Sequence, residues 1–359
     1  MQNNQAIPFN KDNFKQIFSV KFLLVIAISV PSAIVADYLS LPLAWFLGPM
    51  LATSIGALVG LKIIIPRIIL SSILILLGLY IGNYIDKDLF SQIHEWALTS
   101  VIMLFYILIS IFVVSKYLQK YSNYEKKTSI FSSAPGALGP LMILAEDQKS
   151  DLSHVATSHL IRLIIIITIF PFFVNSYYVE GQLQEVQQNF ENQNIYHLFI
   201  LIIFSIILIL FFNKIKFPAA LLAGTLVASG ILQITEIASY KISPDIVDYC
   251  LLILGSSVGC RFANKTFYEI SKNAFHSLVA TFLLVFLGLL AAYVASLVID
   301  KNIFSLILSY CPGGIYEVAV IAIFFDLDPE FVAFHHIIRL LLILLIVPII
   351  LSLNKKNYL

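Results

Sequence analysis

The chain has 359 residues, of which 59% are hydrophobic and 12% are charged, and its mean hydropathy is +0.92. About a quarter of the residues in soluble domains are charged, so this composition excludes an ordinary soluble protein and indicates a polytopic membrane protein. The net charge of +1 provides no basic field that would attract nucleic acid.

Long apolar segments follow one another along the chain. A bilayer core needs about 20 apolar residues in a helix, and backbone polar groups cannot stay unpaired in lipid, so these segments are predicted to be membrane helices. The first is too long for the core of a signal peptide and is predicted to be retained. Two further stretches, 130–145 and 303–325, are interrupted by Pro-Gly. The predicted helices cover 17–39, 41–61, 66–85, 97–118, 154–175, 195–213, 217–237, 246–262, 275–298 and 331–352.

The chain repeats itself at a nearly constant distance. Pro135 and Pro312 are 177 positions apart, and so are Arg162 and Arg339. Matching anchor groups in one register indicate an internal duplication. We therefore predict a first transmembrane repeat over 1–176, a polar acidic connecting loop over 177–194 and a second transmembrane repeat over 195–359.

The charges of equivalent loops differ between the two repeats. Lys and Arg collect in cytoplasmic loops. The loop after 97–118 is rich in lysine, whereas its counterpart contains only Asp300 and Lys301 as charged residues. This swap predicts inverted repeats of about five crossings each, with broken Pro-Gly helices and both termini in the cytoplasm. The alternative is two parallel repeats of about six crossings each.

The Pro-Gly segments provide the first candidate site. Proline removes a helix donor and glycine permits non-helical angles, so each segment is predicted to break its helix. Non-helical backbone at membrane depth is tolerated where it is buried in protein or lines a water-filled cavity, which makes paired breaks a candidate substrate site. A packing kink is the alternative. The substrate-binding candidates here are Pro135, Gly136, Pro312, Gly313 and Gly314.

Ionisable residues inside the apolar segments provide the other candidates. Glu317, whose counterpart is Pro140, is predicted to couple a proton or ion, because an acid in an apolar segment is costly; a residue reaching the interface is the alternative. His and Arg at positions i and i+3 share a helix face and are predicted to bind an anionic substrate or to pair with Glu317, with snorkelling as the alternative. These pairs are His159 with Arg162, and His336, preceded by His335, with Arg339; Asp151 and Asp328 are predicted N-terminal caps of the same helices.

At these residues the sequence resembles the bacterial AbrB family of duplicated membrane proteins. Members carry an LP-x-x-W-x-x-G-P segment, a PGG-x-x-E segment and an H-x-x-R segment, in two copies. The first repeat departs from this pattern, because Ala137 and Pro140 replace a glycine and the glutamate. The matching residues are Leu41, Pro42, Trp45, Gly48 and Pro49, then Pro312, Gly313, Gly314 and Glu317, and then His336 and Arg339.

The resemblance implies the fold of a duplicated membrane protein. Family members carry the labels of transcriptional regulator and of ammonia monooxygenase. The chain has no soluble DNA-binding domain and no basic patch, so direct binding of nucleic acid is not expected. Its scattered histidines, and three cysteines without a zinc spacing, predict no metal site and no cofactor.

The sequence therefore predicts a secondary transporter of a small polar or anionic solute in the bacterial inner membrane, and not an enzyme. It would work by alternating access at the paired broken helices. A membrane sensor that regulates gene expression indirectly is the second hypothesis, and a membrane oxidoreductase is the third. The expected partners are the lipid bilayer and a small-molecule or ion substrate. The substrate, the coupling ion and the oligomeric state, including a homo-oligomer, are left open.

Overall fold

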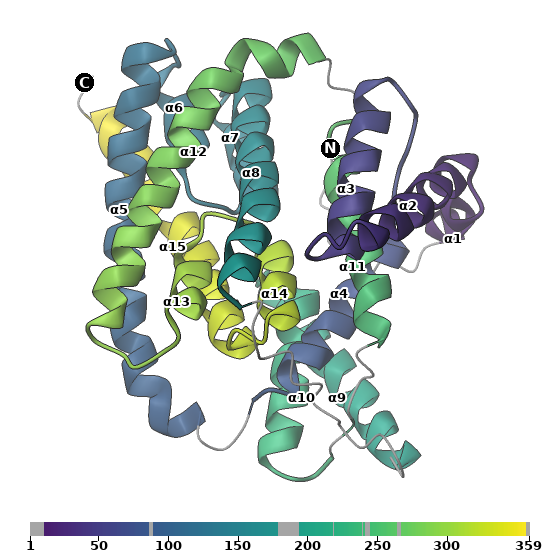
Figure 1. The fold of residues 1–359 in the computed structure, drawn as a ribbon. Coiled ribbons are helices and arrows are strands. Elements are labelled where there is room, and N and C mark those ends of the chain that lie inside the picture. Colours follow the sequence, from purple (N-terminus) through teal and green to yellow (C-terminus); the bar gives the residue numbers. More distant parts are fainter. Residues whose placement is uncertain are drawn as a thin grey trace. The chain divides into compact units, whose positions relative to one another are not determined.

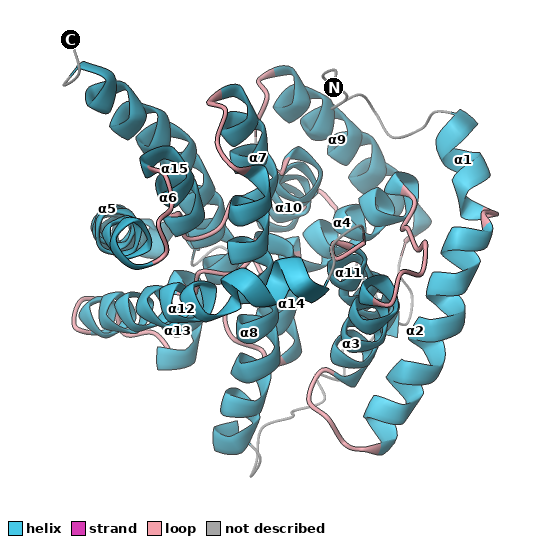
Figure 2. Ribbon diagram, turned by 90° about the horizontal axis from the view of Figure 1, so that it is seen from above, coloured by secondary structure: helices cyan, strands magenta, loops and turns pink. Residues whose placement is uncertain are grey.

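The structure is a computed structural model that describes residues 11–85, 89–178, 194–217, 219–238, 240, 245–263 and 267–356. All regular secondary structure in these ranges is helical, as Figure 2 shows, which confirms the predicted all-α membrane protein. Most of the predicted connecting loop lies outside the described residues. By length and composition, six helices could cross a membrane: α2 (Val20–Tyr38), α5 (Leu89–Tyr121), α8 (Leu152–Tyr178), α9 (Ile195–Lys214), α12 (Phe267–Ser296) and α15 (Pro329–Lys356).

The chain forms two compact units, and each unit contains a part of both predicted repeats. Unit 1 comprises Met1–Leu89 and Pro171–Thr266, and unit 2 comprises Phe90–Phe170 and Phe267–Leu359. Helix α8 passes from unit 2 into unit 1 at Pro171. The units therefore cut across the two halves of the sequence.

Unit 1 is held together by close helix crossings. Helix α11 packs on α3 and α10 packs on α4, so each pair joins one helix from each predicted repeat. A Cβ atom added to Gly255 in α11 would collide with the backbone carbonyl of Phe46 in α3. Small residues allow such close approach between membrane helices. The helices of this unit (Figure 1) are α1 (Lys11–Ile17), α2, α3 (Ala44–Leu58), α4 (Arg67–Gly82), α9, α10 (Ala220–Ile234) and α11 (Asp245–Cys260).

Replacing Gly255 with alanine is expected to lower the stability of the purified protein by about 1–3 kcal/mol, because the backbone of α3 must move to admit the methyl group. Gly139 is the matched control. A Cβ atom there meets no atom within 4 Å, so Gly139→Ala should leave the stability nearly unchanged. Thermal unfolding in detergent measures both variants, and equal stability of the two would contradict the close crossing.

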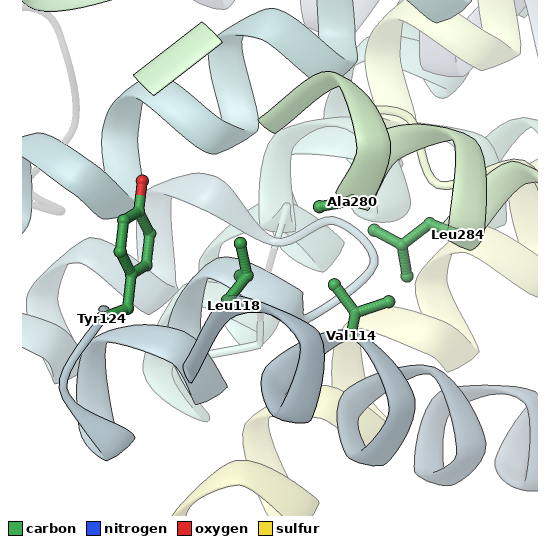
Figure 3. Close-up of a cluster of buried hydrophobic side chains, with 5 residues drawn as sticks. All are labelled: Val114, Leu118, Tyr124, Ala280 and Leu284. Carbon is green, nitrogen blue, oxygen red and sulfur yellow. The ribbon is translucent and has the colours of Figure 1, made fainter. Parts of the chain in front are cut away.

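Unit 2 contains the two Pro-Gly segments. Helices α5 and α12 run side by side along one part of this unit (Figure 1), where Val114 and Leu118 pack against Ala280 and Leu284, with Tyr124 in the same cluster (Figure 3). The other helices are α6 (Lys126–Ser133), α7 (Leu138–Asp147), α8 up to Phe170, α13 (Ile303–Tyr310), α14 (Ile315–Phe324) and α15. Both Pro-Gly segments separate two short helices, so the predicted helix breaks are confirmed.

Backbone hydrogen bonds recur in unit 2 at the spacing of the predicted duplication. The amide of Gly136 donates to the carbonyl of Ala134, and that of Gly313 donates to Cys311. In each pair the residues of the second half follow those of the first by 177 positions. The recurrence favours the duplication, which stays a prediction from the sequence.

Candidate functional site

The first helix break covers four residues between α6 and α7. Pro135 has no backbone donor, Gly136 has a φ of 114° and Ala137 has a φ of 63°, so the chain leaves the helical conformation and re-enters it at Leu138. The second break lies between Tyr310 and Ile315 and contains Pro312 and Gly313.

The two breaks lie against each other inside unit 2. A Cβ atom built on Gly136 would be 2.9 Å from Nη2 of Arg339 and 3.2 Å from the carbonyl oxygen of Gly313. Glycine at position 136 therefore lets the first break contact both the second break and the arginine that binds it. The structure brings together the Pro-Gly candidates from the two halves of the sequence.

Arg162 and His159 bind the end of α6. The Arg162 guanidinium donates from Nη1 to the Ala134 carbonyl at 2.5 Å and from Nη2 to the Ser132 carbonyl at 2.6 Å. His159 Nε2 donates to the Phe131 carbonyl at 3.0 Å. Arg162 is only 1% exposed, so these contacts are fully desolvated.

Arg339 and His336 bind the end of α13 in the same way. Arg339 donates from Nη1 to the Cys311 carbonyl, and from Nη2 to the Gly313 carbonyl at 2.6 Å and to His336 Nδ1 at 3.0 Å. His336 Nε2 contacts the Leu308 carbonyl at 2.9 Å. A guanidinium can only donate, so Nδ1 of His336 accepts and its proton is on Nε2, where it meets the carbonyl.

These contacts satisfy the last backbone carbonyls of α6 and α13, the short helices that precede the two breaks. The last carbonyls of a helix have no partner within the helix and carry the negative end of its dipole, which favours a cation beside them. Each arginine provides that charge from a helix elsewhere in the same unit. The predicted arginines are therefore at the breaks, but their hydrogen bonds go to backbone carbonyls and, for Arg339, also to His336. Arg162 Nε is buried and has no hydrogen-bond partner among the described residues.

The starts of α7 and α14, the short helices that follow the two breaks, differ from each other. Glu317 is in the first turn of α14 and is 1% exposed, and its carboxylate lies directly beside Gly314, the N-cap residue. In α7 the N-cap residue Ala137 gives no side-chain hydrogen bond, and the first turn has no acidic residue. Negative charge at a helix start is favourable. The second half provides that charge from within the chain, and the first half does not.

Two tyrosines beside the breaks are absent from the candidates predicted from the sequence. Tyr106 is 4% exposed, and its hydroxyl donates to the Leu284 carbonyl at 3.5 Å. The Tyr310 ring contacts the Tyr106 ring edge-on at 6.2 Å, and its hydroxyl donates to the Thr99 carbonyl at 2.7 Å. The sequence signal that could have identified Tyr106 is its position in the middle of an apolar segment.

His335 lies apart from the contacts of Arg339. Its Nδ1 donates to the Phe331 carbonyl at 2.9 Å, and its Nε2 is 2.8 Å from Oγ1 of Thr99. Positions i−4 and i−3 both lie on the Arg339 face of the helix, but only His336 hydrogen-bonds to the guanidinium. Across the described ranges, no three His, Cys, Asp or Glu side chains are grouped so that they could hold a metal ion.

The two predicted N-terminal caps also differ. Asp151 Oδ1 accepts from the backbone amide of His154 at 3.0 Å, as expected for a cap of α8. Both oxygens of Asp328 accept from side chains instead, one from Lys301 and the other from Ser305. The same carboxylate position therefore has different partners in the two halves.

Comparison with known proteins identifies relatives along nearly the whole chain. The family model described as "Transition state regulatory protein AbrB" matches residues 7–88 and 45–355. A Bacillus subtilis (strain 168) protein named "Uncharacterized protein YhjN" is 21% identical over 356 residues, which cover 92% of each chain. An Escherichia coli (strain K12) protein named "Putative regulator AbrB" is 22% identical over 314 residues, covering 86% of this chain and 89% of that protein.

No solved structure matches the chain. The family match agrees with the paired Pro-Gly and His-Arg segments from which the resemblance was first drawn. The chain belongs to the AbrB family.

Proposed function

We propose that the protein is a secondary transporter of a small polar or anionic solute, and not an enzyme. The observation that carries this proposal is the contact between two broken helices from opposite halves of the chain, around two buried arginines. Interrupted helices in equivalent positions are typical of transporter binding sites.

The partners at the breaks favour an anionic group over a cation. Arginine and histidine side chains already occupy carbonyls at the ends of α6 and α13, so these helix ends are poor ligands for a metal cation. Helix starts offer backbone donors and positive potential. The start of α7 has no acidic residue in its first turn, and Gly139 there is exposed. We therefore propose that a carboxylate of the solute binds at the start of α7.

Glu317 is proposed to couple transport to a proton or an ion. Its carboxylate is buried at the start of α14, directly after the second break. Its counterpart Pro140 cannot titrate, so coupling would come from the second half alone.

We place the protein in the bacterial inner membrane, with both termini in the cytoplasm, on the basis of its loop charges. The same charges support inverted repeats. Oppositely inserted halves can exchange conformations, so a site formed by both can open to each side in turn. The chain passes between unit 1 and unit 2 three times, after Leu89, Phe170 and Thr266, and the candidate site lies within unit 2.

A membrane sensor is the second candidate function. The description of the matching family and the name of the Escherichia coli relative both refer to regulation. A sensor would bind the solute at the same breaks and act on gene expression through a partner, without moving the solute.

Flux into vesicles separates the two functions. The purified full chain would be reconstituted in liposomes and tested for uptake of radiolabelled monocarboxylates, with binding measured in parallel. A transporter is expected to take up at least one compound that it binds, and Arg162→Gln should reduce that uptake. Binding without uptake of any bound compound would support the sensor and contradict the transporter.

A further inference from the structure

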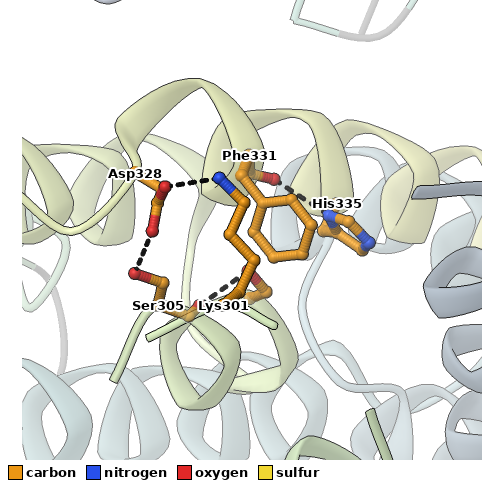
Figure 4. A network of polar contacts seen from close by, with 6 residues as sticks. Lys301, Ser305, Asp328, Phe331 and His335 are labelled. Carbon is orange, nitrogen blue, oxygen red and sulfur yellow. Dashed lines mark hydrogen bonds and ion pairs between the residues drawn. The ribbon is translucent and has the colours of Figure 1, made fainter. Parts of the chain in front are cut away.

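A second candidate binding site lies beside α8, away from the helix breaks. The positions 177 residues later in the sequence, which the predicted duplication makes equivalent, indicate what such a site would bind. There, Lys301 Nζ lies 2.7 Å from Oδ1 of Asp328, and Ser305 Oγ donates to Oδ2 at 2.6 Å (Figure 4). The Lys301 ammonium also lies over the Phe331 ring, 5.8 Å from its centre. An ammonium from the chain itself therefore occupies this place.

In the first half the equivalent positions hold an acid, a hydroxyl and, in place of the Phe331 ring, the His154 imidazole. Among the described residues, no ammonium is paired with this acid. Asp151 matches Asp328 by position, and its backbone amide donates to Thr128 Oγ1, the counterpart of Ser305, at 3.1 Å. The counterpart of Lys301 is Tyr124. Its ring belongs to the hydrophobic cluster with Leu118 and Leu284 (Figure 3) and meets the His154 ring edge-on at 4.5 Å.

A cavity of about 340 Å³ is present at this place. Its lining includes two carboxylates, Glu125 and Asp151, the hydroxyl of Thr128, the rings of Tyr124 and His154, and the Lys149 side chain. The cavity is large enough for a small organic molecule. Its two acids outnumber its one lysine, so the lining favours a cationic group.

Asp151 is held in its charged form. Burial alone would raise the pKa of its carboxyl, but hydrogen bonds from the His154 backbone amide and imidazole lower the pKa below its usual value. His154 Nδ1 lies 2.6 Å from Oδ2 of Asp151, and the carboxylate remains about half exposed. It can therefore accept a further donor from the cavity.

We propose that this cavity binds the ammonium group of a small organic amine, which would sit on Asp151 as the Lys301 ammonium sits on Asp328. The amine would lie in the cavity beside the Tyr124 ring, because the face of a tyrosine ring favours a cation. The site is independent of the helix breaks and of whether the protein transports a solute.

The probe is n-butylammonium, which has the same four carbons and ammonium as a lysine side chain. Binding to the purified full chain in detergent would be measured by saturation-transfer NMR, with butyrate as the anionic control. The wild type should bind n-butylammonium in preference to butyrate. Asp151→Asn, which can still cap α8, should weaken binding by at least about tenfold, whereas the matched Asp328→Asn should not.

A second variant tests the comparison between the two halves directly. Lys301→Ala removes the ammonium that the chain provides to Asp328 and should create an additional site for n-butylammonium, which would also raise the unfolding temperature of that variant. Equal binding of butyrate and n-butylammonium by the wild type, or unchanged binding by Asp151→Asn, would overturn the proposal. Neither result depends on solute flux.

Discussion

Replacing Arg339 with glutamine is expected to lower the free energy of unfolding by about 3 kcal/mol, because two buried carbonyls lose a charged donor. The guanidinium binds Cys311 and Gly313 across the second break, and glutamine lacks both its charge and its fork of donors. Folded proteins are stable by only about 5–15 kcal/mol, so the variant should unfold at a clearly lower temperature and lose activity. Thermal unfolding in detergent measures the stability.

Two further variants test whether the loss of stability comes from the carbonyls that Arg339 binds at the end of α13. Arg339→Lys keeps the charge but donates from a single nitrogen, so it should lose an intermediate amount of stability. Arg67→Gln removes an exposed arginine at the start of α4 and should change stability by less than about 0.5 kcal/mol. Wild-type stability of Arg339→Gln would show that the arginine does not support the break.

Replacing Glu317 with glutamine is expected to abolish accumulation of the solute driven by a proton gradient, while exchange of solute continues. Glutamine has the shape of glutamate but cannot titrate. One pH unit corresponds to about 1.4 kcal/mol, so it can drive about tenfold accumulation for each coupled proton. The wild type should approach that ratio across one pH unit, and Glu317→Gln should only equilibrate the solute.

The matched control is Glu146→Gln in α7, which removes an exposed acid in the same unit. It should accumulate solute as the wild type does. If Glu317→Gln also accumulates solute normally, another group couples the ion, and Glu317 serves to stabilise the start of α14.

The helices were predictable from the sequence, and their division into two units was not. Each predicted apolar segment contains a helix in the described part of the chain, because uncharged apolar segments have no other stable form in lipid. A helix facing lipid and one facing protein have similar apolar composition, however. The pairing of α3 with α11 depends on contacts such as that of Gly255 with Phe46, which connect distant parts of the chain.

The sequence predicted which residues form the candidate site better than it predicted what those residues contact. Repetition identified Arg162 and Arg339, and the structure places both at the breaks. Their carbonyl partners are 26–30 residues away along the chain, in the breaks and at the end of α6. The side-chain chemistry of an arginine alone had suggested an anion as its partner. Tyr106 has no repeated motif around it and was found only from its contact with the Tyr310 ring.

Accessibility of a single cysteine at position 139 tests alternating access at the breaks most directly. Gly139 is exposed at the start of α7, and a side chain there meets no atom within 4 Å. In a chain whose native cysteines are replaced, with Cys311→Ala copying Ala134 of the first half, an impermeant thiol reagent would be applied to right-side-out and inside-out vesicles. We predict labelling from both sides of the membrane, with solute or pH changing the ratio. Labelling from one side only, at every pH and with every solute tested, would contradict transport at the paired breaks.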